Sequence, residues 1–179
     1  DGNNFVRNHG ETFGVTGDVG GMIGREGVAV SGQNVYNNNS SIIADNGALS
    51  VLSKGTLDNT RAMLVSGADA IIKAAGTFYN NYATTYSAGN LDITAGTLNN
   101  YSDGSMESNT ATGVIASDKN LNLTVDNNVT NYGWISGKGD LNFTILKGAL
   151  TNRNAISSGN ALAINALNGV ENFKDIVGV

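Results

Sequence analysis

The 179-residue sequence contains no cysteine and no proline, and its only histidine is His9. Without cysteine, the chain forms neither a disulfide framework nor a cysteine-ligated zinc site. A single histidine cannot build a multi-histidine metal site, and His9 has no evident nucleophile as a partner. The absence of proline leaves every backbone N–H able to donate, as an uninterrupted strand ladder requires. These absences favour a structure held by backbone hydrogen bonds.

Charge is also scarce, since 14% of the residues are charged and the net charge is −5. The ten basic residues are scattered singly along the chain, whereas binding to phosphate backbones or anionic membranes requires clustered lysine and arginine. We therefore expect no nucleic-acid partner and no membrane-surface partner. No apolar run is long enough to span a bilayer, so membrane insertion is not expected either. A surface built mainly of uncharged polar side chains is typical of extracellular β-structures.

One pair of residues recurs along the whole chain, a large apolar residue followed two positions later by asparagine. Five of the seven gaps between successive asparagines are 20 to 22 residues, and the other two are 29 and 31 residues. A fixed period of this length indicates stacked supersecondary units. The recurring asparagines are Asn8, Asn37, Asn59, Asn80, Asn100, Asn131, Asn152 and Asn172.

Each unit opens with two alternating apolar residues, such as Leu91 and Ile93, which predict a strand with one buried face. A turn and the asparagine follow. Short strands repeated in this way predict an all-β, right-handed parallel β-helix of about eight coils, forming one domain over residues 1–179. At a spacing of ~4.8 Å per coil, the rod is roughly 40 Å long. The second short strand of each unit is marked by Met63, Ile135, Ile156 and Ile176.

Asparagine suits a recurring corner for two reasons. It tolerates the left-handed backbone conformation that a sharp corner requires. Its amide can also donate to the same amide in one neighbouring coil and accept from the other, which forms a ladder. The predicted role of the eight asparagines is therefore structural, with simple turn formation or sugar binding as the alternatives.

Segments such as GALSVLSKGTLDN (47–59), GNLDITAGTLNN (89–100) and residues 134–172 follow the pattern L-x-[IL]-x-A-x₂-[LV]-x-N with I-x-[SA]-x-G. They resemble the repeats of filamentous-haemagglutinin-type exoproteins, the two-partner-secretion adhesins of Gram-negative bacteria, and of the related contact-dependent growth inhibition exoproteins. The resemblance covers about residues 27–179. It implies a secreted or cell-surface β-helical shaft, adhesion or toxin delivery, and an outer-membrane two-partner-secretion transporter as a partner.

The secretion domain of that family carries NPNG and NPNL motifs, which a chain without proline cannot contain. The resemblance therefore implies an internal shaft segment, for which the family defines no catalytic residue, and a transporter-binding domain outside these residues. The first ten residues do not resemble a signal peptide, and residues 170–179 still follow the repeat pattern. We expect the segment to be part of a much longer exoprotein.

The two long gaps predict insertions of about nine and eleven residues, within 10–26 and 102–114. Both begin after a recurring asparagine, so both are expected at one corner of the coil, four coils or roughly 19 Å apart. Long insertions on a repeat scaffold commonly carry binding functions. The first is rich in glycine, and the second has Met106 as its only large apolar residue. Ligand contact and a tolerated surface excursion are both open interpretations.

Aromatic side chains provide further candidate ligand contacts. Four tyrosines fall on adjacent coils and predict an exposed aromatic strip suited to a carbohydrate or a protein. Trp134, beside the Asn131 corner, suits either stacking on a sugar ring or packing against a neighbouring coil. The candidate ligand-contact residues are therefore Tyr79, Tyr82, Tyr86, Tyr101, Trp134 and Met106.

An enzyme that cleaves polysaccharide on a β-helix would need two or three carboxylates together on one outer face. Asp92 is predicted to have Lys73, Asn122 and Asn142 at equivalent outward positions, so no carboxylate pair forms there. At the strand-entry corner, turn formation is favoured over weak Ca²⁺ binding for two predicted aspartate pairs, Asp45 with Asp69 and Asp118 with Asp140. We expect no catalytic residue, no cofactor and no metal site.

Three functions remain, in decreasing order of support. The first is a structural shaft segment that extends or displays a distal adhesin or toxin domain on the bacterial surface. The second is a binding module in its own right, which contacts a receptor or glycan of a host or neighbouring cell through the insertions or the tyrosine strip. The third is an enzyme acting on polysaccharide, which the missing carboxylate pair disfavours.

Overall fold

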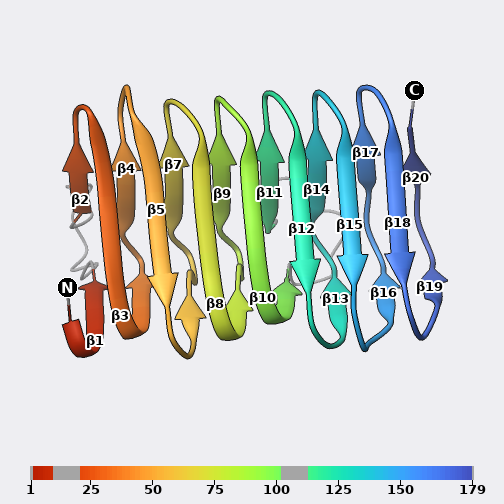
Figure 1. The fold of residues 1–179 in the computed structure, drawn as a ribbon, viewed down its shortest axis with the longest axis horizontal. Helices are drawn as coiled ribbons and strands as arrows, with labels where there is room; N and C mark the ends of the chain where they lie inside the picture. The colour runs from red at the N-terminus through yellow and green to blue at the C-terminus, as the bar shows by residue number, and fades with distance from the viewer. Residues whose placement is uncertain (1, 10–20, 102–112, 179) are drawn as a thin grey trace, which may run out of the picture.

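The computed structural model describes residues 2–9, 21–101 and 113–178. These residues form twenty strands and no helix, and none of them provides a helix that could cross a membrane. The strands wind into a solenoid with three faces per coil (Figure 1). The chain descends along the front, ascends at the back and advances from left to right, so the coil is right-handed (Figure 1). The predicted right-handed parallel β-helix is confirmed.

The first and second faces together form a twelve-stranded sheet. Four long strands bend through both faces: β1 (Gly2–His9), β3 (Gly27–Asn38), β8 (Ala70–Tyr79) and β10 (Leu91–Asn100). In the other coils the first face is formed by β5 (Ala48–Ser53), β12 (Leu121–Val125), β15 (Leu141–Ile145) and β18 (Leu162–Ala166). Their second face is formed by β6 (Leu57–Asp58), β13 (Val129–Asn131), β16 (Leu150–Asn152) and β19 (Val170–Asn172).

The third face is a separate eight-stranded sheet with one strand from each coil, which confirms the predicted number of about eight coils. All of its strands pair in parallel, as do those of the other sheet. Its strands are β2 (Gly21–Gly24), β4 (Ser41–Ala44), β7 (Met63–Ser66), β9 (Thr84–Ser87), β11 (Val114–Ser117), β14 (Trp134–Gly137), β17 (Ile156–Ser158) and β20 (Ile176–Val177).

The core is a set of apolar columns that run along the inside of the solenoid. Leu91 pairs in register with Ala70 on one side and Leu121 on the other, and all three side chains are buried. Ile93 lies in the next inward column, between Ile72 and Leu123. Each fully buried large apolar side chain contributes about 1.5–3 kcal/mol relative to an exposed one. Because each coil has only one layer of such residues, it buries them only by stacking on its neighbours.

The third face corrects one detail of the predicted pattern. Met63 begins β7 but points outward, with 41% of its surface exposed, and Leu64 is the buried residue. Leu64 is in register with Thr85 of β9, and further along the same column lie Ile135 and Ile156, as predicted. Met63 therefore marks the correct strand but belongs to its outer face.

The ranges within which the two insertions are predicted extend into regular strands at their C-terminal ends. Gly21–Gly24 is a regular third-face strand, with Gly21 opposite Ser41, so the coil has resumed by residue 21. The second range ends inside β11, because Val114 pairs with Thr84 and Trp134. Residues 10–20 and 102–112 lie outside the described residues. Each of these ranges is flanked by a second-face strand and a third-face strand, β1 and β2 for the first and β10 and β11 for the second.

Candidate ligand-contact corner

The corner between the second and third faces is built on the predicted asparagine ladder. Each side-chain Nδ2 donates to the Oδ1 of the asparagine in the next coil. For Asn80 this distance is 2.9 Å to Asn100, and for Asn100 it is 2.8 Å to Asn131. The other four bonds measure 2.7–3.0 Å and link Asn37 to Asn59, Asn59 to Asn80, Asn131 to Asn152, and Asn152 to Asn172. The predicted ladder is therefore continuous from Asn37 to Asn172.

Burial explains why these amides must be paired. Asn80, Asn100 and Asn131 have no exposed surface, and a buried amide without partners costs several kcal/mol. Asn8 is in backbone register with Asn37, but its side chain lies outside the described ones.

The same amides also tie two faces of the solenoid together. Besides its ladder bond, the Asn80 Nδ2 donates to the Val114 carbonyl at 2.9 Å, and the Asn100 Nδ2 donates to the Trp134 carbonyl at 3.2 Å. Each carbonyl belongs to the third-face strand of the following coil. The ladder thus fixes where the chain leaves the second face of one coil and where it enters the third face of the next.

The ladder asparagines do not have the left-handed backbone conformation that was expected of them at the corner. That expectation is wrong, and other residues adopt this conformation. Among the described non-glycine residues, positive φ angles occur at Asn39 (51°), Arg61 (52°) and Tyr82 (53°). Each lies two residues after a ladder asparagine. In these coils the asparagine lies near or directly after the end of the second-face strand and is fully buried, and the sharp turn is made by the residue two positions later.

A column of aromatic and arginine side chains lies outside the ladder, along the same corner. The Tyr82 and Tyr101 rings meet edge to face at a centroid distance of 5.7 Å, and the Tyr101 and Tyr132 rings are tilted at 5.3 Å. Such arrangements favour the ring quadrupoles. We call the whole column the aromatic corner, and it consists of Arg61, Tyr82, Tyr101, Tyr132, Arg153 and Phe173.

Arginine guanidinium groups lie on both sides of the three tyrosines. The Arg61 Cζ is 5.7 Å from the centre of the Tyr82 ring, and the Arg153 Cζ is 5.8 Å from that of Tyr132 and 4.1 Å from that of Phe173. These are cation–π distances. Tyr101 has 39% of its surface exposed, and Tyr82 and Tyr132 are partly exposed.

Apolar residues of the third face border the aromatic corner. Trp134 is the first residue of β14 and has 55% of its surface exposed. It is in register with Val114, and three coils before Trp134 the same column contains the exposed Met63. Trp134 thus points outward beside the Asn131 corner, as its sugar-stacking interpretation requires.

The predicted tyrosine strip is divided among three places. Tyr82 and Tyr101 lie in the aromatic corner. Tyr79 lies on the outer side of the second face, in register with Asp58 and Asn99. Tyr86 lies on the third face, in register with Val65 and Ala116. Met106 is outside the described residues, so the prediction for its side chain is not tested.

The sequence interpretation overlooked four members of the aromatic corner, namely Arg61, Tyr132, Arg153 and Phe173. A signal for them was present, because each follows a ladder asparagine by one or two positions. Counting from the asparagine, and not from the strand, would have placed these residues at the corner.

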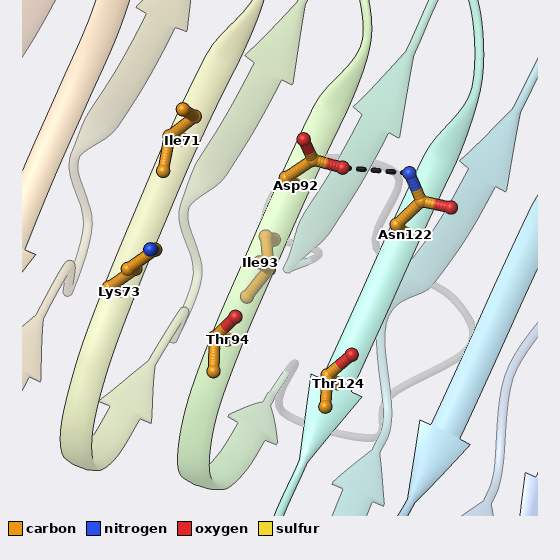
Figure 2. A pocket seen from close by; sticks show the side chains of 7 residues that line it. All are labelled: Ile71, Lys73, Asp92, Ile93, Thr94, Asn122 and Thr124. Atoms are coloured by element: carbon orange, nitrogen blue, oxygen red, sulfur yellow. Dashed lines mark hydrogen bonds between the residues drawn. The ribbon is translucent and has the colours of Figure 1, made fainter.

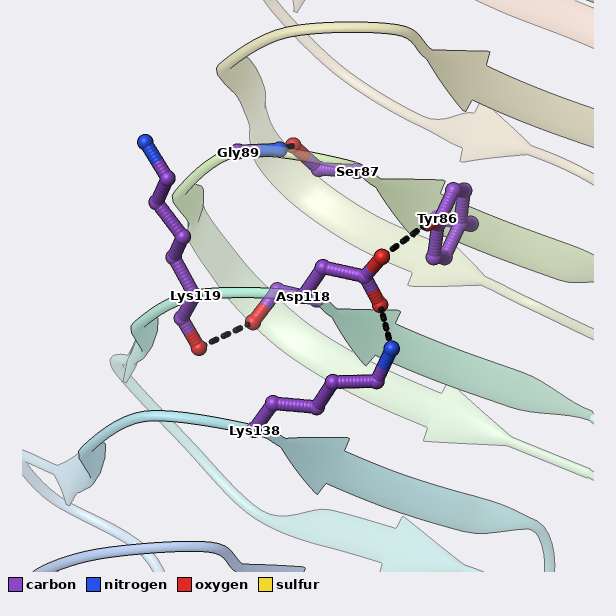
Figure 3. Close-up of polar contacts among 7 residues, drawn as sticks. Tyr86, Ser87, Gly89, Asp118, Lys119 and Lys138 are labelled. Atoms are coloured by element: carbon purple, nitrogen blue, oxygen red, sulfur yellow. Dashed lines mark hydrogen bonds and ion pairs between the residues drawn. The ribbon is translucent and has the colours of Figure 1, made fainter.

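Tyr86, on the third face, belongs to a chain of polar contacts with Asp118 and Lys138 that links three consecutive coils (Figure 3). Its Oη donates to the Asp118 Oδ2 at 2.7 Å, and the Lys138 Nζ is 2.8 Å from the Asp118 Oδ1. The Lys138 hydrogen bond, followed by that from Tyr86, holds the pKa of the Asp118 carboxyl below its ordinary value of 3.8. The hydrogen bond to Asp118 is also the main cause that raises the pKa of Tyr86 above 10.0.

The aspartate pairs predicted at the strand-entry corner do not form. Asp118 is opposite Lys138, since their backbone N–H groups donate to Ser87 and Ser117 of successive coils. Asp140 lies in a different column, where its N–H donates to the Asn120 Oδ1 at 2.9 Å. Within the described ranges, no group of three or more His, Cys, Asp or Glu side chains is arranged to hold a metal ion.

The first face carries a hollow of about 290 Å³ that is lined by residues of β8, β10 and β12, Asp92 among them (Figure 2). The Asp92 Oδ1 accepts from Asn122 at 2.7 Å, and the Asn122 Oδ1 accepts from Asn142 at 3.1 Å, so these three residues are equivalent as predicted. Lys73, however, is opposite Thr94, and Ile71 is the partner of Asp92. The hollow therefore contains one carboxylate, an amide and a lysine, and lacks the second carboxylate that glycoside hydrolysis uses.

Comparison with protein families gives a match over most of the chain. The haemagglutinin repeat family matches residues 14–61, 60–101 and 86–172. No curated protein and no solved structure matches the chain. The three matched segments contain the ladder asparagines from Asn37 to Asn172 and every residue of the aromatic corner except Phe173. The chain belongs to the haemagglutinin repeat family, as a filamentous-haemagglutinin-type repeat region.

Proposed function

We propose that this chain is a shaft segment of a secreted or cell-surface adhesin of a Gram-negative bacterium, and that it supports attachment to other cells without catalysis. The observation that carries this proposal is the uninterrupted asparagine ladder. It runs from Asn37 to Asn172 through successive coils with bonds of 2.7–3.0 Å. Such a ladder gives a stiff rod of fixed direction, as the displacement of a distal domain from the cell surface requires. The same shaft would serve a contact-dependent growth inhibition exoprotein.

In this proposal, export depends on an outer-membrane two-partner-secretion transporter that recognises a domain outside these residues. A shaft gains from folding that depends only on neighbouring coils, because each coil can then stack as it emerges. The hydrogen bonds of this chain are of that kind, since each ladder bond joins one coil to the next.

The proposal predicts that whole coils are dispensable. Leu49 is in register with Ala70, and Leu121 with Leu141, so deletion of 49–69 or of 121–140 removes one coil without changing the register. In the complete exoprotein, a shaft tolerates either deletion, and surface display and cell attachment persist. Deletion of 121–130 is the control, because it removes half a coil and breaks the stack. Loss of attachment after deletion of 49–69, with surface display intact, would contradict a pure shaft.

The aromatic corner favours a second candidate function. In this alternative, the chain is a binding module that contacts a carbohydrate or a protein of a receptor. Stacking on exposed rings is a common way to hold a sugar, and Tyr101 and Trp134 are accessible. The two coil deletions separate the candidates. Deletion of 121–140 removes Tyr132 and Trp134, whereas deletion of 49–69 removes only Arg61 from the aromatic corner and leaves its aromatic rings in the chain. A binding module that stacks its ligand on these rings loses attachment on deletion of 121–140 and keeps it on deletion of 49–69.

Point variants test the binding module directly. A glycan array screened with the purified chain should give hits that Tyr101→Ala and Trp134→Ala abolish. Tyr79→Ala is the matched control, because Tyr79 lies on the second face, away from the aromatic corner. Equal loss of binding in all three variants would refute a specific role of the corner.

A further inference from the structure

The corner between the second and third faces occurs with different lengths in different coils. Four residues separate the ladder asparagine from the inward residue of the next third-face strand in three coils, such as Asn80 to Thr85. Three residues separate them in the last three coils, such as Asn131 to Ile135. From Asn100 to Ile115 there are fourteen residues, and from Asn8 to Met22 there are thirteen. The ladder and the inward columns keep their register across all of these lengths.

The two short corners differ in backbone conformation as well as in length. The four-residue corners contain the left-handed residues Asn39, Arg61 and Tyr82. No residue of the three-residue corners after Asn131, Asn152 and Asn172 has a positive φ angle. The solenoid therefore accommodates two different chain paths at this corner without disturbing the faces on either side.

The chain is held firmly on both sides of residues 102–112. Before them, the Tyr101 carbonyl accepts from the Tyr82 N–H at 2.9 Å, and the Tyr101 ring lies between those of Tyr82 and Tyr132. After them, the Val114 N–H donates to Ala83 at 2.8 Å, and the Val114 carbonyl accepts from the Asn80 amide. None of these bonds involves residues 102–112.

The two ends are also close together. A Cβ atom placed on Gly113 would lie 2.9 Å from the Tyr101 carbonyl oxygen, 2.6 Å from the Asn80 carbonyl oxygen and closer still to the Asn100 Oδ1. All three distances are shorter than real Cβ contacts, so glycine is required at this point. Tyr101 and Gly113 are thus neighbours in space although they are twelve positions apart in the sequence.

The next coil shows what a direct connection looks like. Its corner reads Asn131-Tyr132-Gly133-Trp134-Ile135, with Gly133 packed against the Gly113 carbonyl and the Asn100 amide. Joining Tyr101 to Gly113 gives Asn-Tyr-Gly-Val-Ile, which differs from that corner at one outward position. Val114 and Trp134, the residues at this position, are already opposite each other in register.

We propose that residues 102–112 are an insert in a corner that is complete without them, and that this corner is a port where the solenoid accepts added sequence without changing register. The proposal depends on the register of the coils and not on the proposed adhesion. The gap after Asn8 lies at the same corner four coils earlier, so two coils of this chain have added sequence at this corner. A binding loop placed there can change while the shaft is kept.

Two deletions of equal length test this proposal in the full chain. Deletion of 102–112 leaves Gly113 after Tyr101, whereas deletion of 103–113 leaves Ser102 at the same point, where its Cβ meets Asn100 and Asn80. We expect the first variant to keep the β-sheet circular dichroism spectrum and to unfold at the same temperature or up to about 5 °C higher, because a long loop has been closed. We expect the second to unfold several degrees lower.

Transfer of residues 102–112 to the equivalent point between Tyr132 and Gly133 completes the experiment. A port predicts that this chain folds with an unchanged circular dichroism spectrum. A fall of more than about 5 °C in the unfolding temperature on deletion of 102–112 would overturn the proposal. So would equal unfolding temperatures of the two deletions, since the corner would then not close through glycine. These stability results are independent of any loss of cell attachment, which concerns the proposed adhesion.

Discussion

Replacement of Asn100 by alanine should be far more damaging than the same replacement at Asn122. Asn100 accepts from Asn80 at 2.9 Å, donates to Asn131 at 2.8 Å and donates to the Trp134 carbonyl at 3.2 Å, all with no exposed surface. Each such bond contributes about 0.5–1.5 kcal/mol, and a buried group left without its partner costs more. With the small cavity that alanine leaves, we expect a loss of about 3–5 kcal/mol in the free energy of unfolding.

Asn122 is a matched control because it is bonded in the same pattern on the outside of the first face. It donates to Asp92 at 2.7 Å and accepts from Asn142 at 3.1 Å, and water can replace both partners. Asn122→Ala should therefore cost less than about 1 kcal/mol. Equilibrium denaturation in urea, followed by circular dichroism, measures both values. Equal costs for the two variants would refute the view that burial gives the inner ladder its importance.

Three further predictions use the same measurements or a titration. Leu64→Ala should cost about 2–5 kcal/mol because Leu64 is fully buried, whereas Met63→Ala should change stability by less than about 0.5 kcal/mol; equal costs would mean that the register of β7 is wrong. Gly47→Ala should destabilise the chain, because the new Cβ would overlap the Glu26 carbonyl oxygen; an unchanged urea midpoint would contradict that packing. The Asp118 carboxyl should titrate below 3.8 by carbon-13 NMR and move upward in Lys138→Met; since its pKa is lowered by folding, the stabilisation it gives is present above the unfolded pKa and is lost as the pH falls through the folded value.

The inward side of the solenoid was predictable because stacking forces repetition there. Parallel strands in register place the same position of every coil in one column, so an inward position must be filled by similar residues throughout. The column from Ala70 through Leu91 to Leu121 follows this rule, as do the ladder asparagines. Periodicity in the sequence is therefore direct information about the interior.

The outward side was less predictable because no neighbour restricts its residue types, and because the corner length varies. Tyr79 and Tyr82 are three positions apart but lie on different sides of the ladder corner. Tyr82 and Tyr132 are equivalent, although one follows its asparagine by two positions and the other by one. An aromatic cluster of this kind can be located only after the corner lengths are known.

A second buried column shows why asparagine never changes along the ladder while other inward polar positions do. Ser66, Ser87 and Ser158 lie inside the corner between the third and first faces, and their hydroxyls donate to backbone carbonyls. At equivalent positions the chain has Ala44 and Gly137, opposite Ser66 and Ser158. A serine bonded to the backbone can be replaced in one coil without leaving the serine of the next coil unpaired. An asparagine bonded to asparagines on both sides cannot be replaced without breaking two ladder bonds, so selection for the stack acts on all of them together.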